Sequence, residues 1–204
     1  MSKAFTREDN APEEDFAGDD ESNPIPPGSK NYLTPAGWRR MRDEVQWLVN
    51  SERPEVTSVV SWAAKLGDRS ENADYQYGKK RLREIDRRIR YLTKRLEAAE
   101  VVDPSTREDT DQVFFGATVT YADRKGEEHT VRIVGIDEMD PAKHYVSWIS
   151  PIARAFIKCR EGDTVTLHTP AGNEELEILE VRYEEIPMEP FVAPRNDWSP
   201  NAKE

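Results

Sequence analysis

Residues 75–99, YQYGKKRLREIDRRIRYLTKRLEAA, decide the fold of this chain. Apolar or small residues recur here at steps of three and four, with mostly charged residues between them: Tyr75, Gly78, Leu82, Ile85, Ile89, Leu92, Leu96 and Ala99. A 3.5-residue repeat kept up over about three heptads or more is typical of a helix in a coiled coil. We therefore expect one long helix with a narrow apolar seam.

A second helical pattern lies upstream. Thr34 and Pro35 are a helix start, because Thr accepts a hydrogen bond from a free amide and Pro at the first position leaves none unpaired. Apolar residues follow at a helical period: Trp38, Met41, Val45, Leu48, Val56, Val59, Ala63 and Leu66. We expect Pro54 to kink this helix and Gly67 to end it. Two helices of roughly 30 residues joined by a short turn must lie antiparallel, in a hairpin about 40–45 Å long.

The pattern changes after Pro104. Five stretches rich in Val, Ile, Thr and aromatic residues are separated by turn sequences: VFFGATVTYA, EHTVRIVGI, HYVSWIS, DTVTLHT and ELEILEVRYEE. They predict strands of an antiparallel sheet. Ser150 and Pro151 predict one short helix with Ile152, Ala155 and Phe156 facing inward. The predicted fold class is α+β, a long antiparallel coiled-coil hairpin followed by a small antiparallel sheet domain.

Composition divides the chain into four parts. Only 36% of the 204 residues are hydrophobic and 34% are charged, which indicates elongated parts and not one deep core. Residues 1–30 are acidic and poor in large apolar groups, so we expect a disordered tail. Residues 31–103 are the predicted hairpin, with its tip at 67–72. Residues 104–186 are the predicted sheet domain, and 187–204 a second tail.

Composition also excludes several classes of protein. No apolar run approaches the ~20 residues that cross a bilayer, and the N-terminus lacks the apolar core of a signal peptide. We expect a soluble cytoplasmic protein without a membrane partner. Cys159 is the only cysteine, which excludes an intrachain disulfide and a cysteine-based metal site. The three histidines are expected to be ordinary strand or loop residues: His129, His144 and His168.

Two carboxylates, Asp68 and Glu71, lie in the turn between the predicted helices. One interpretation is structural, because acids near a helix N-terminus complement its dipole or cap it. The other is chemical, because carboxylates suit Mg²⁺, a cation that takes about six oxygen ligands and keeps several waters. Two carboxylates are too few for a tight private site, so the other ligands would come from another protein's active site. An autonomous nuclease would need more ligands than the sequence offers.

A dense basic stretch follows the tip. Residues 79–95 hold nine cationic side chains against only two acidic ones: Lys79, Lys80, Arg81, Arg83, Arg87, Arg88, Arg90, Lys94 and Arg95. Like charges close together on a helix repel, so the stretch is intrinsically costly, and a polyanion is the usual partner. The alternative is a solvated face. Since the formal net charge is -11, we expect local contact with nucleic acid, guided by another protein, and not coating of duplex DNA.

These features occur together in one known family. Over about residues 32–186 the chain resembles the bacterial Gre transcript cleavage factors, and among them the GreB type. The resemblance is carried by ERPEVTSVVSWAAKLGDRSENADYQYGKKRLREIDRRIRYLTKRLE, FFGATV, RIVGIDE, SPIARA and TPAGNEE. The Gly-Asp-x-x-Glu-Asn-x-x-Tyr motif at 67–75, followed by the basic helix, is highly specific. The resemblance implies an antiparallel coiled coil and a C-terminal domain of FKBP-like fold.

The resemblance also implies a function. Such a factor is not an enzyme; it binds bacterial RNA polymerase at the rim of the secondary channel and stimulates cleavage of the 3′ end of backtracked RNA. By the motif match, Asp68 would ligate a second Mg²⁺ shared with the polymerase, and Glu71 would help bind it or orient the attacking water. No cofactor of its own is expected. The basic stretch would hold the extruded RNA. A monomer is expected, which would dock on the polymerase through Ser150, Pro151, Ile152, Ala153 and Arg154.

Three other functions stay open from the sequence. A regulator that occupies the same channel without cleavage would not need the acidic tip. A prolyl isomerase or chaperone would act through the FKBP-like domain, and a general RNA-binding coiled coil would bind RNA without polymerase. The acidic tail 1–30 is expected to be inert, with the alternative that it competes with RNA for the basic stretch.

Overall fold

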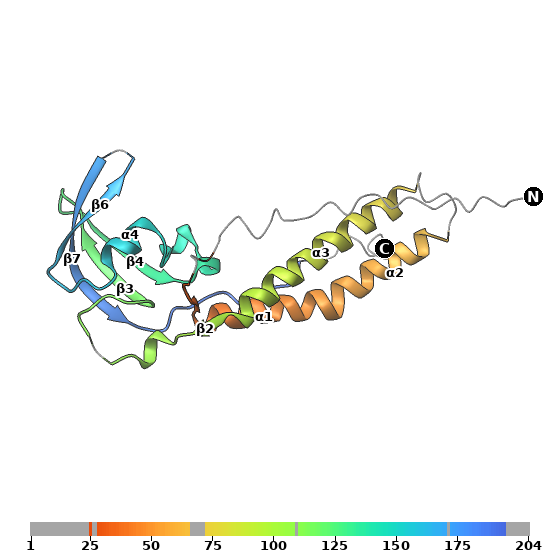
Figure 1. Cartoon of the computed structure of the whole chain (residues 1–204), viewed down its shortest axis with the longest axis horizontal. Helices are drawn as coiled ribbons and strands as arrows, with labels where there is room; N and C mark the ends of the chain where they lie inside the picture. The colour runs from red at the N-terminus through yellow and green to blue at the C-terminus, as the bar shows by residue number, and fades with distance from the viewer. Residues whose placement is uncertain (1–24, 26–27, 66–71, 109, 171, 195–204) are drawn as a thin grey trace, which may run out of the picture.

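The computed structural model describes residues 25, 28–65, 72–108, 110–170 and 172–194 of the chain. A long helical hairpin extends from one side of a small β-sheet domain (Figure 1). The predicted fold class, a helical hairpin followed by an antiparallel sheet domain, is confirmed, with one pair of strands parallel. The finer likeness to the FKBP fold stays a prediction.

The first arm of the hairpin consists of three helical pieces in a row. α1 (Pro35–Trp47) begins at the predicted cap Thr34, whose Oγ1 accepts a hydrogen bond of 3.1 Å from the amide of Gly37. η1 (Leu48–Glu52) is a π-helical turn. α2 (Arg53–Ala63) then carries the arm toward the tip.

The expected interruption at Pro54 takes the form of this π turn. A proline inside an α-helix has no amide to offer, and its ring presses on the carbonyl four residues earlier. Just before Pro54 the turn widens, so that the amide of Arg53 donates to the carbonyl of Leu48, five residues back. Such single wide turns occur inside α-helices. The arm therefore continues past the proline.

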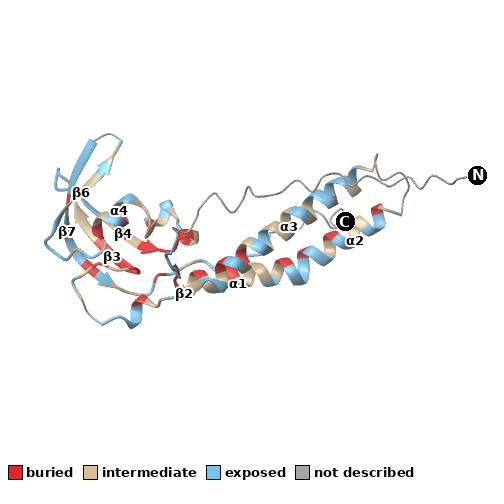
Figure 2. Cartoon of the chain, viewed as in Figure 1, coloured by how far each residue is buried: buried red, intermediate tan, exposed pale blue. Residues whose placement is uncertain are grey.

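α3 (Ala73–Glu97) is the second arm and carries the apolar stripe from Tyr75 to Leu96. Buried residues follow the seam where the two arms meet (Figure 2): Met41, Leu48, Val56, Ile85 and Leu92. The arms approach closely at Gly78, where a Cβ would lie 2.4 Å from Cγ2 of Val60. Glycine is therefore required at this position of the stripe by space and not by backbone angle.

The base of the hairpin holds a two-stranded sheet that the sequence did not predict. β1 (Asn31–Leu33) pairs in parallel with β2 (Ala99–Val101), so the chain that enters the first arm lies beside the chain that leaves the second. The side-chain amide of Asn31 also donates to the carbonyl of Arg95 at 2.9 Å. Ala99, the expected last residue of the helical stripe, belongs to β2, because α3 ends at Glu97.

The sheet domain has five strands in the order β5-β4-β3-β7-β6. Four of the predicted stretches contain one strand each: β3 (Ala117–Ala122), β4 (Glu128–Val134), β5 (Tyr145–Ser147) and β6 (Thr164–Thr169). The fifth strand, β7 (Gly172–Tyr183), begins three residues before its predicted stretch, which starts at residue 175. Neighbouring strands are antiparallel except β4 and β5, which are parallel. The exception arises because two 3₁₀ turns, η3 (Ile136–Glu138) and η4 (Pro141–Lys143), connect β4 to β5 in place of a hairpin turn.

The short helix α4 (Pro151–Phe156) covers the core of the sheet domain. Its cap Ser150 accepts a hydrogen bond of 3.3 Å from the amide of Ala153, as predicted. Ala153 and Phe156 are fully buried, whereas Ala155, which was expected to face inward, is half-buried. Among the helices of the described ranges, none has the length and apolar character that crossing a bilayer requires.

Candidate functional site

Asn72, at the end of the turn, forms hydrogen bonds with both helices of the hairpin. Its side-chain oxygen accepts hydrogen bonds from the amides of Asp74 and Tyr75 at 3.1 and 3.2 Å, which caps α3. Its side-chain nitrogen donates to the carbonyl of Ala63 at 3.0 Å, at the end of α2. One residue thus ties together the two helix ends that flank the turn. The predicted carboxylates Asp68 and Glu71 lie in that turn, outside the described residues.

Three of the predicted RNA-binding arginines are engaged within the chain. They are Arg81, Arg88 and Arg95, spaced seven residues apart on one side of α3. Arg81 donates to Glu52 at 2.9 Å through Nε and at 2.5 Å through Nη2, and to Glu84 at 3.2 Å. Glu52 is buried in the π turn, so this pair joins the two arms midway along the hairpin.

The other two arginines, Arg88 and Arg95, also form ion pairs with acidic residues, closer to the base of the hairpin. Arg88 donates to the carboxylate of Glu44 on α1 through Nε at 2.7 Å and Nη2 at 3.0 Å. Arg95 is buried, forms an ion pair of 3.4 Å with Asp137 of η3, and packs 5.1 Å from the ring centre of Tyr91. We call Arg81, Arg88 and Arg95 the paired column; its ion pairs hold the hairpin together and join it to the sheet domain.

Exposure alone does not separate the other basic residues of α3 from the paired column, because the side chain of Arg88 is 49% exposed while those of Arg81 and Arg95 are more buried. Lys79, Lys80, Arg83, Arg90 and Lys94 are exposed, and Arg87 is half-buried. Lys79 lies 5.5 Å from the ring centre of Tyr75. The sequence shows nine cations in one stretch but does not show which of them form ion pairs. The acidic partners of the paired column lie at residues 44, 52 and 137, outside that stretch. We call the exposed ones, Lys79, Lys80, Arg83, Arg90 and Lys94, the outward cations; they begin about two helical turns behind the tip.

The hairpin and the sheet domain are joined at Glu138, which the sequence analysis did not single out. Its carboxylate accepts hydrogen bonds from the amide and hydroxyl of Thr34 at 3.0 and 2.5 Å, and from the amide of Gly135 at 2.6 Å. A Cβ on Gly37 would lie 1.8 Å from Oε1 of Glu138, so that glycine makes room for the carboxylate. Burial raises the pKa of Glu138 to about 7, against the hydrogen bonds from Thr34 and Gly135, which lower it.

The predicted docking segment 150–154 divides into a buried and an exposed part. Ala153 is fully buried in the sheet core, while Pro151 and Arg154 are exposed. Arg154 also lines a groove of about 660 Å³ whose other walls are mainly aromatic and cationic: Tyr32, Glu100, Val102, Arg107, Phe114, Phe115, Trp148, Ile157 and Lys158. This groove could not be predicted from the sequence, because its aromatic residues come from separate stretches that only the fold brings together.

Among the described residues, one cluster in the sheet domain has ligand atoms close enough together to bind a cation. The ligand atoms of Asp123, Glu127 and His129 all lie within 4.8 Å of one another at the turn between β3 and β4. Asp123 accepts hydrogen bonds from the amides of Lys125 and Glu127 at 2.8 and 2.9 Å. These bonds lower the pKa of Asp123 and account for its position as a turn residue.

The sequence of the chain matches two family models. "Transcription elongation factor, N-terminal" matches residues 31–101, and "Transcription elongation factor, GreA/GreB, C-term" matches residues 108–183. The chain belongs to the GreA/GreB family of transcription elongation factors. The first match covers β1 and the whole hairpin, and the second covers the five-stranded sheet, so both units described above are GreA/GreB domains.

Individual GreA/GreB relatives agree with the GreB type predicted from the sequence. Transcription elongation factor GreB of Neisseria meningitidis serogroup A is 65% identical over 158 residues, which are 78% of this chain and 97% of the relative. GreB of Yersinia pestis is 52% identical over 153 residues, 75% of this chain and 89% of the relative. The crystal structure of GreA factor homolog 1 of Thermus thermophilus is 23% identical, with a TM-score of 0.36, over 76% of this chain and 99% of its own.

Proposed function

We propose that this GreA/GreB chain binds bacterial RNA polymerase and stimulates cleavage of the 3′ end of backtracked RNA, which returns arrested complexes to elongation. It acts as an accessory factor: the polymerase performs the hydrolysis. The sheet domain docks at the rim of the secondary channel, and the hairpin reaches through the channel to the active site. Membership of the family supports the general role. The sequence motif at the tip, together with the cap Asn72, supports the cleavage mechanism.

The observation that carries the proposal is the role of Asn72. Because Asn72 caps α3 and donates a hydrogen bond to the end of α2, the capping role first considered for the tip acids is already performed by another side chain. Asp68 and Glu71 are then available for chemistry in the turn. Carboxylates at a narrow end suit a shared ion, since two of them are too few to satisfy Mg²⁺ alone.

The roles of the residues follow from their charge and place. A Mg²⁺ ion shared with the polymerase would lower the pKa of a bound water and stabilise charge on the scissile phosphate. Asp68 supplies a ligand to it, and Glu71 supplies a further ligand or orients the attacking water. The outward cations Lys80, Arg83 and Arg90 lie behind the tip, where they attract the phosphates of extruded RNA.

The test is addition of the full chain to a stalled, backtracked bacterial elongation complex. Shortening of the RNA from its 3′ end, followed by renewed elongation on addition of nucleotides, is the expected result. The same RNA incubated with the chain alone should stay intact, since the factor is not a nuclease. Binding to polymerase without any shortening would favour the alternative of a channel regulator that does not cleave.

A further inference from the structure

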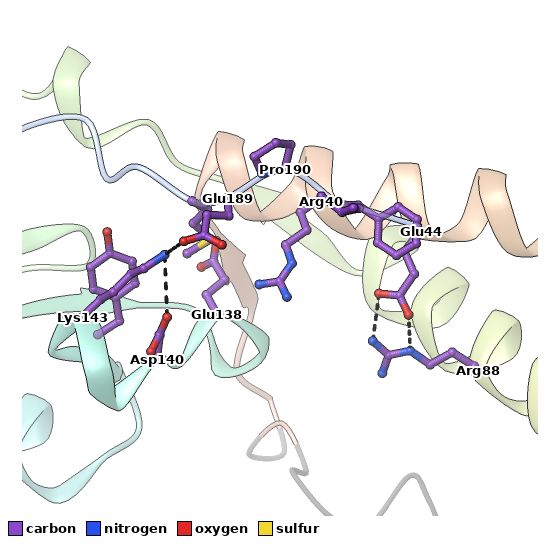
Figure 3. A pocket seen from close by; sticks show the side chains of 12 residues that line it. Arg40, Glu44, Arg88, Glu138, Asp140, Lys143, Glu189 and Pro190 are labelled. Carbon is purple, nitrogen blue, oxygen red and sulfur yellow. Dashed lines mark hydrogen bonds and ion pairs between the residues drawn. The ribbon is translucent and has the colours of Figure 1, made fainter. Parts of the chain in front are cut away.

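The C-terminal segment of the chain crosses from the sheet domain back to the hairpin. Both family matches end before it, at residue 183 at the latest. Residues 187–194 run past η4 and along α1, and Figure 3 shows Glu189 and Pro190 of this segment between Lys143 and Arg40. From the sequence these residues were expected to form a tail, because their prolines and weak periodicity predict no helix or strand.

The start of the segment is anchored on the sheet domain. Ile186 is buried in a small cluster with Val134 and Tyr145, and Met188 packs against that cluster. The hydroxyl of Tyr145 donates to the carbonyl of Pro187 at 2.7 Å. Apolar burial and a backbone hydrogen bond therefore fix where the segment leaves the sheet.

An ion pair holds the middle of the segment to the same domain. Nζ of Lys143 in η4 lies 2.7 Å from a carboxylate oxygen of Glu189, and 3.9 Å from Asp140 (Figure 3). The pair lowers the pKa of Glu189. Since the side chain of Glu189 is 82% exposed, the ion pair fixes the position of the segment more than it contributes to stability.

The end of the segment touches the hairpin. The ring of Phe191 lies 5.5 Å from that of Trp47, centre to centre, at an angle of 46°. Trp47 is the last residue of α1, directly before the π turn. Met188, Phe191 and Val192 wall a cleft of about 550 Å³ between the domains, opposite Arg40 and Glu44 of α1. The segment therefore spans the gap from sheet to hairpin.

We propose that residues 187–194 form a strap that fixes the direction of the hairpin relative to the sheet domain, with Phe191 as a positioning residue through Trp47. In the proposed function, on which this inference rests for its effect on cleavage, the sheet domain docks outside the channel and the tip works inside it. The angle between the two domains then decides where the tip carboxylates arrive.

The length of the hairpin makes this angle important. From Pro35 to Ala63 the first arm is about 40 Å long at 1.5 Å per residue, so a rotation of about 10° at the base moves the tip by roughly 7 Å. Displacement of a catalytic group by even about 1 Å can lower a rate about a hundredfold. Glu138 and the paired column hold the base of the hairpin; the strap adds a contact farther along its first arm, at the end of α1.

The experiment compares Phe191→Ala with Val192→Ala in the full chain. Val192 is adjacent, also apolar and 79% exposed, so its variant is a matched control. Spin labels at Ser58→Cys on α2 and Thr166→Cys on β6, both exposed positions, report the distance between the domains in a Cys159→Ser background. Polymerase affinity and the cleavage rate at saturating factor are measured for the same variants without labels.

The expected result is a broadened distance distribution for Phe191→Ala and an unchanged one for Val192→Ala. Phe191→Ala should bind polymerase as the parent does, yet cleave at least about fivefold more slowly at saturation, because the tip is misplaced. An unchanged distance distribution for Phe191→Ala overturns the strap. If the parent chain itself does not stimulate cleavage, the proposed function fails while the distance measurement still decides on the strap.

Discussion

Asp68 and Glu71 are the side chains on which the proposed cleavage depends. We predict that Asp68→Ala abolishes stimulated cleavage and leaves polymerase affinity unchanged, because the residue belongs to the tip and not to the docking domain. Asp74→Ala is the matched control, since Asp74 is an exposed acid in the first turn of α3. Gel-based cleavage and binding assays measure both. A loss of affinity that parallels the loss of cleavage would contradict the prediction.

Glu71→Ala should also lower cleavage, and raised Mg²⁺ should restore part of it if the carboxylate is a ligand. A capping residue would behave differently, because its loss lowers helix stability by about 1 kcal/mol without any response to Mg²⁺. Asn72→Ala provides that comparison, since Asn72 is the observed cap. Thermal unfolding of the two variants separates the roles. Equal destabilisation by both changes would argue against a chemical role for Glu71.

Glu138 makes the stability of the junction between the domains depend on pH. Its pKa rises from an ordinary 4.5 to about 7 in the folded chain. Between these values the folded chain keeps a proton that the unfolded chain has lost, so the contribution of Glu138 to the free energy of unfolding falls as pH rises. We predict that the difference in unfolding free energy between the parent and Glu138→Gln declines from pH 5 to 7, by about 3 kcal/mol at most. Urea titrations at each pH measure it, and a difference that does not vary with pH would refute the prediction.

At the scale of the helices, the basic residues of α3 fall into two groups with different expected effects. We predict that Arg83→Glu with Arg90→Glu impairs rescue of deeply backtracked complexes and spares shallow ones, which expose little RNA. The control pair is Arg81→Glu with Arg88→Glu, which breaks the bonds to Glu52 and Glu44. Since Glu52 is buried, its loss of a partner should cost about 3 kcal/mol or more of stability.

The sequence alone would have suggested the second pair as the test of RNA holding. Cleavage of RNAs backtracked by few and by many nucleotides, together with thermal unfolding, distinguishes the groups. The outward pair should change substrate preference with the melting temperature intact, and the paired column should change the melting temperature first. Equal loss on short and long extruded RNA with the outward pair would count against RNA holding.

At Gly78 we expect replacement by alanine to lower the stability of the hairpin, whereas such a replacement in a helix usually raises stability. Replacing an exposed helical glycine by alanine stabilises a helix by about 1 kcal/mol. At Gly78 the added Cβ would meet Val60 at 2.4 Å, so Gly78→Ala should destabilise the hairpin by about 1–3 kcal/mol. The double variant with Val60→Ala should recover part of the loss. A more stable single variant would show that the arms separate freely near the tip.

The sequence predicted the helices, strands and caps because each leaves a local signature. The stripe from Tyr75 to Leu96 and the pairs Thr34-Pro35 and Ser150-Pro151 are examples. The parallel pairing of β1 with β2, the buried Glu138 and the partners of Arg81 could not be predicted this way. They depend on residues that lie tens of positions apart and meet only in the folded chain.

For the molecule as a whole, we expect the N-terminal residues and the residues that follow the sheet domain to differ in their effect on cleavage. The acidic N-terminal residues lie largely outside the described ranges, and we expect deletion of residues 1–24 to leave cleavage of deeply backtracked RNA unchanged at every salt concentration. Higher cleavage by the shortened chain at low salt, fading as salt screens the charges, would mean that the tail competes with RNA. Residues 187–194, in contrast, contact both domains through Glu189 and Phe191.

The π turn has a consequence for the geometry of the first arm. Met41 and Leu48 are seven residues apart, Leu48 and Val56 eight, and Val56 and Ala63 seven again. At about 100° of rotation per residue, an extra residue in a regular α-helix would turn Val56 and everything beyond it a quarter-circle away from α3. Because the π turn holds one residue more than an α turn, it accommodates the extra residue and keeps Val56 on the face that contacts α3. The first arm thus holds one residue more than a regular repeat would, yet α2 turns the same face toward α3 as α1 does.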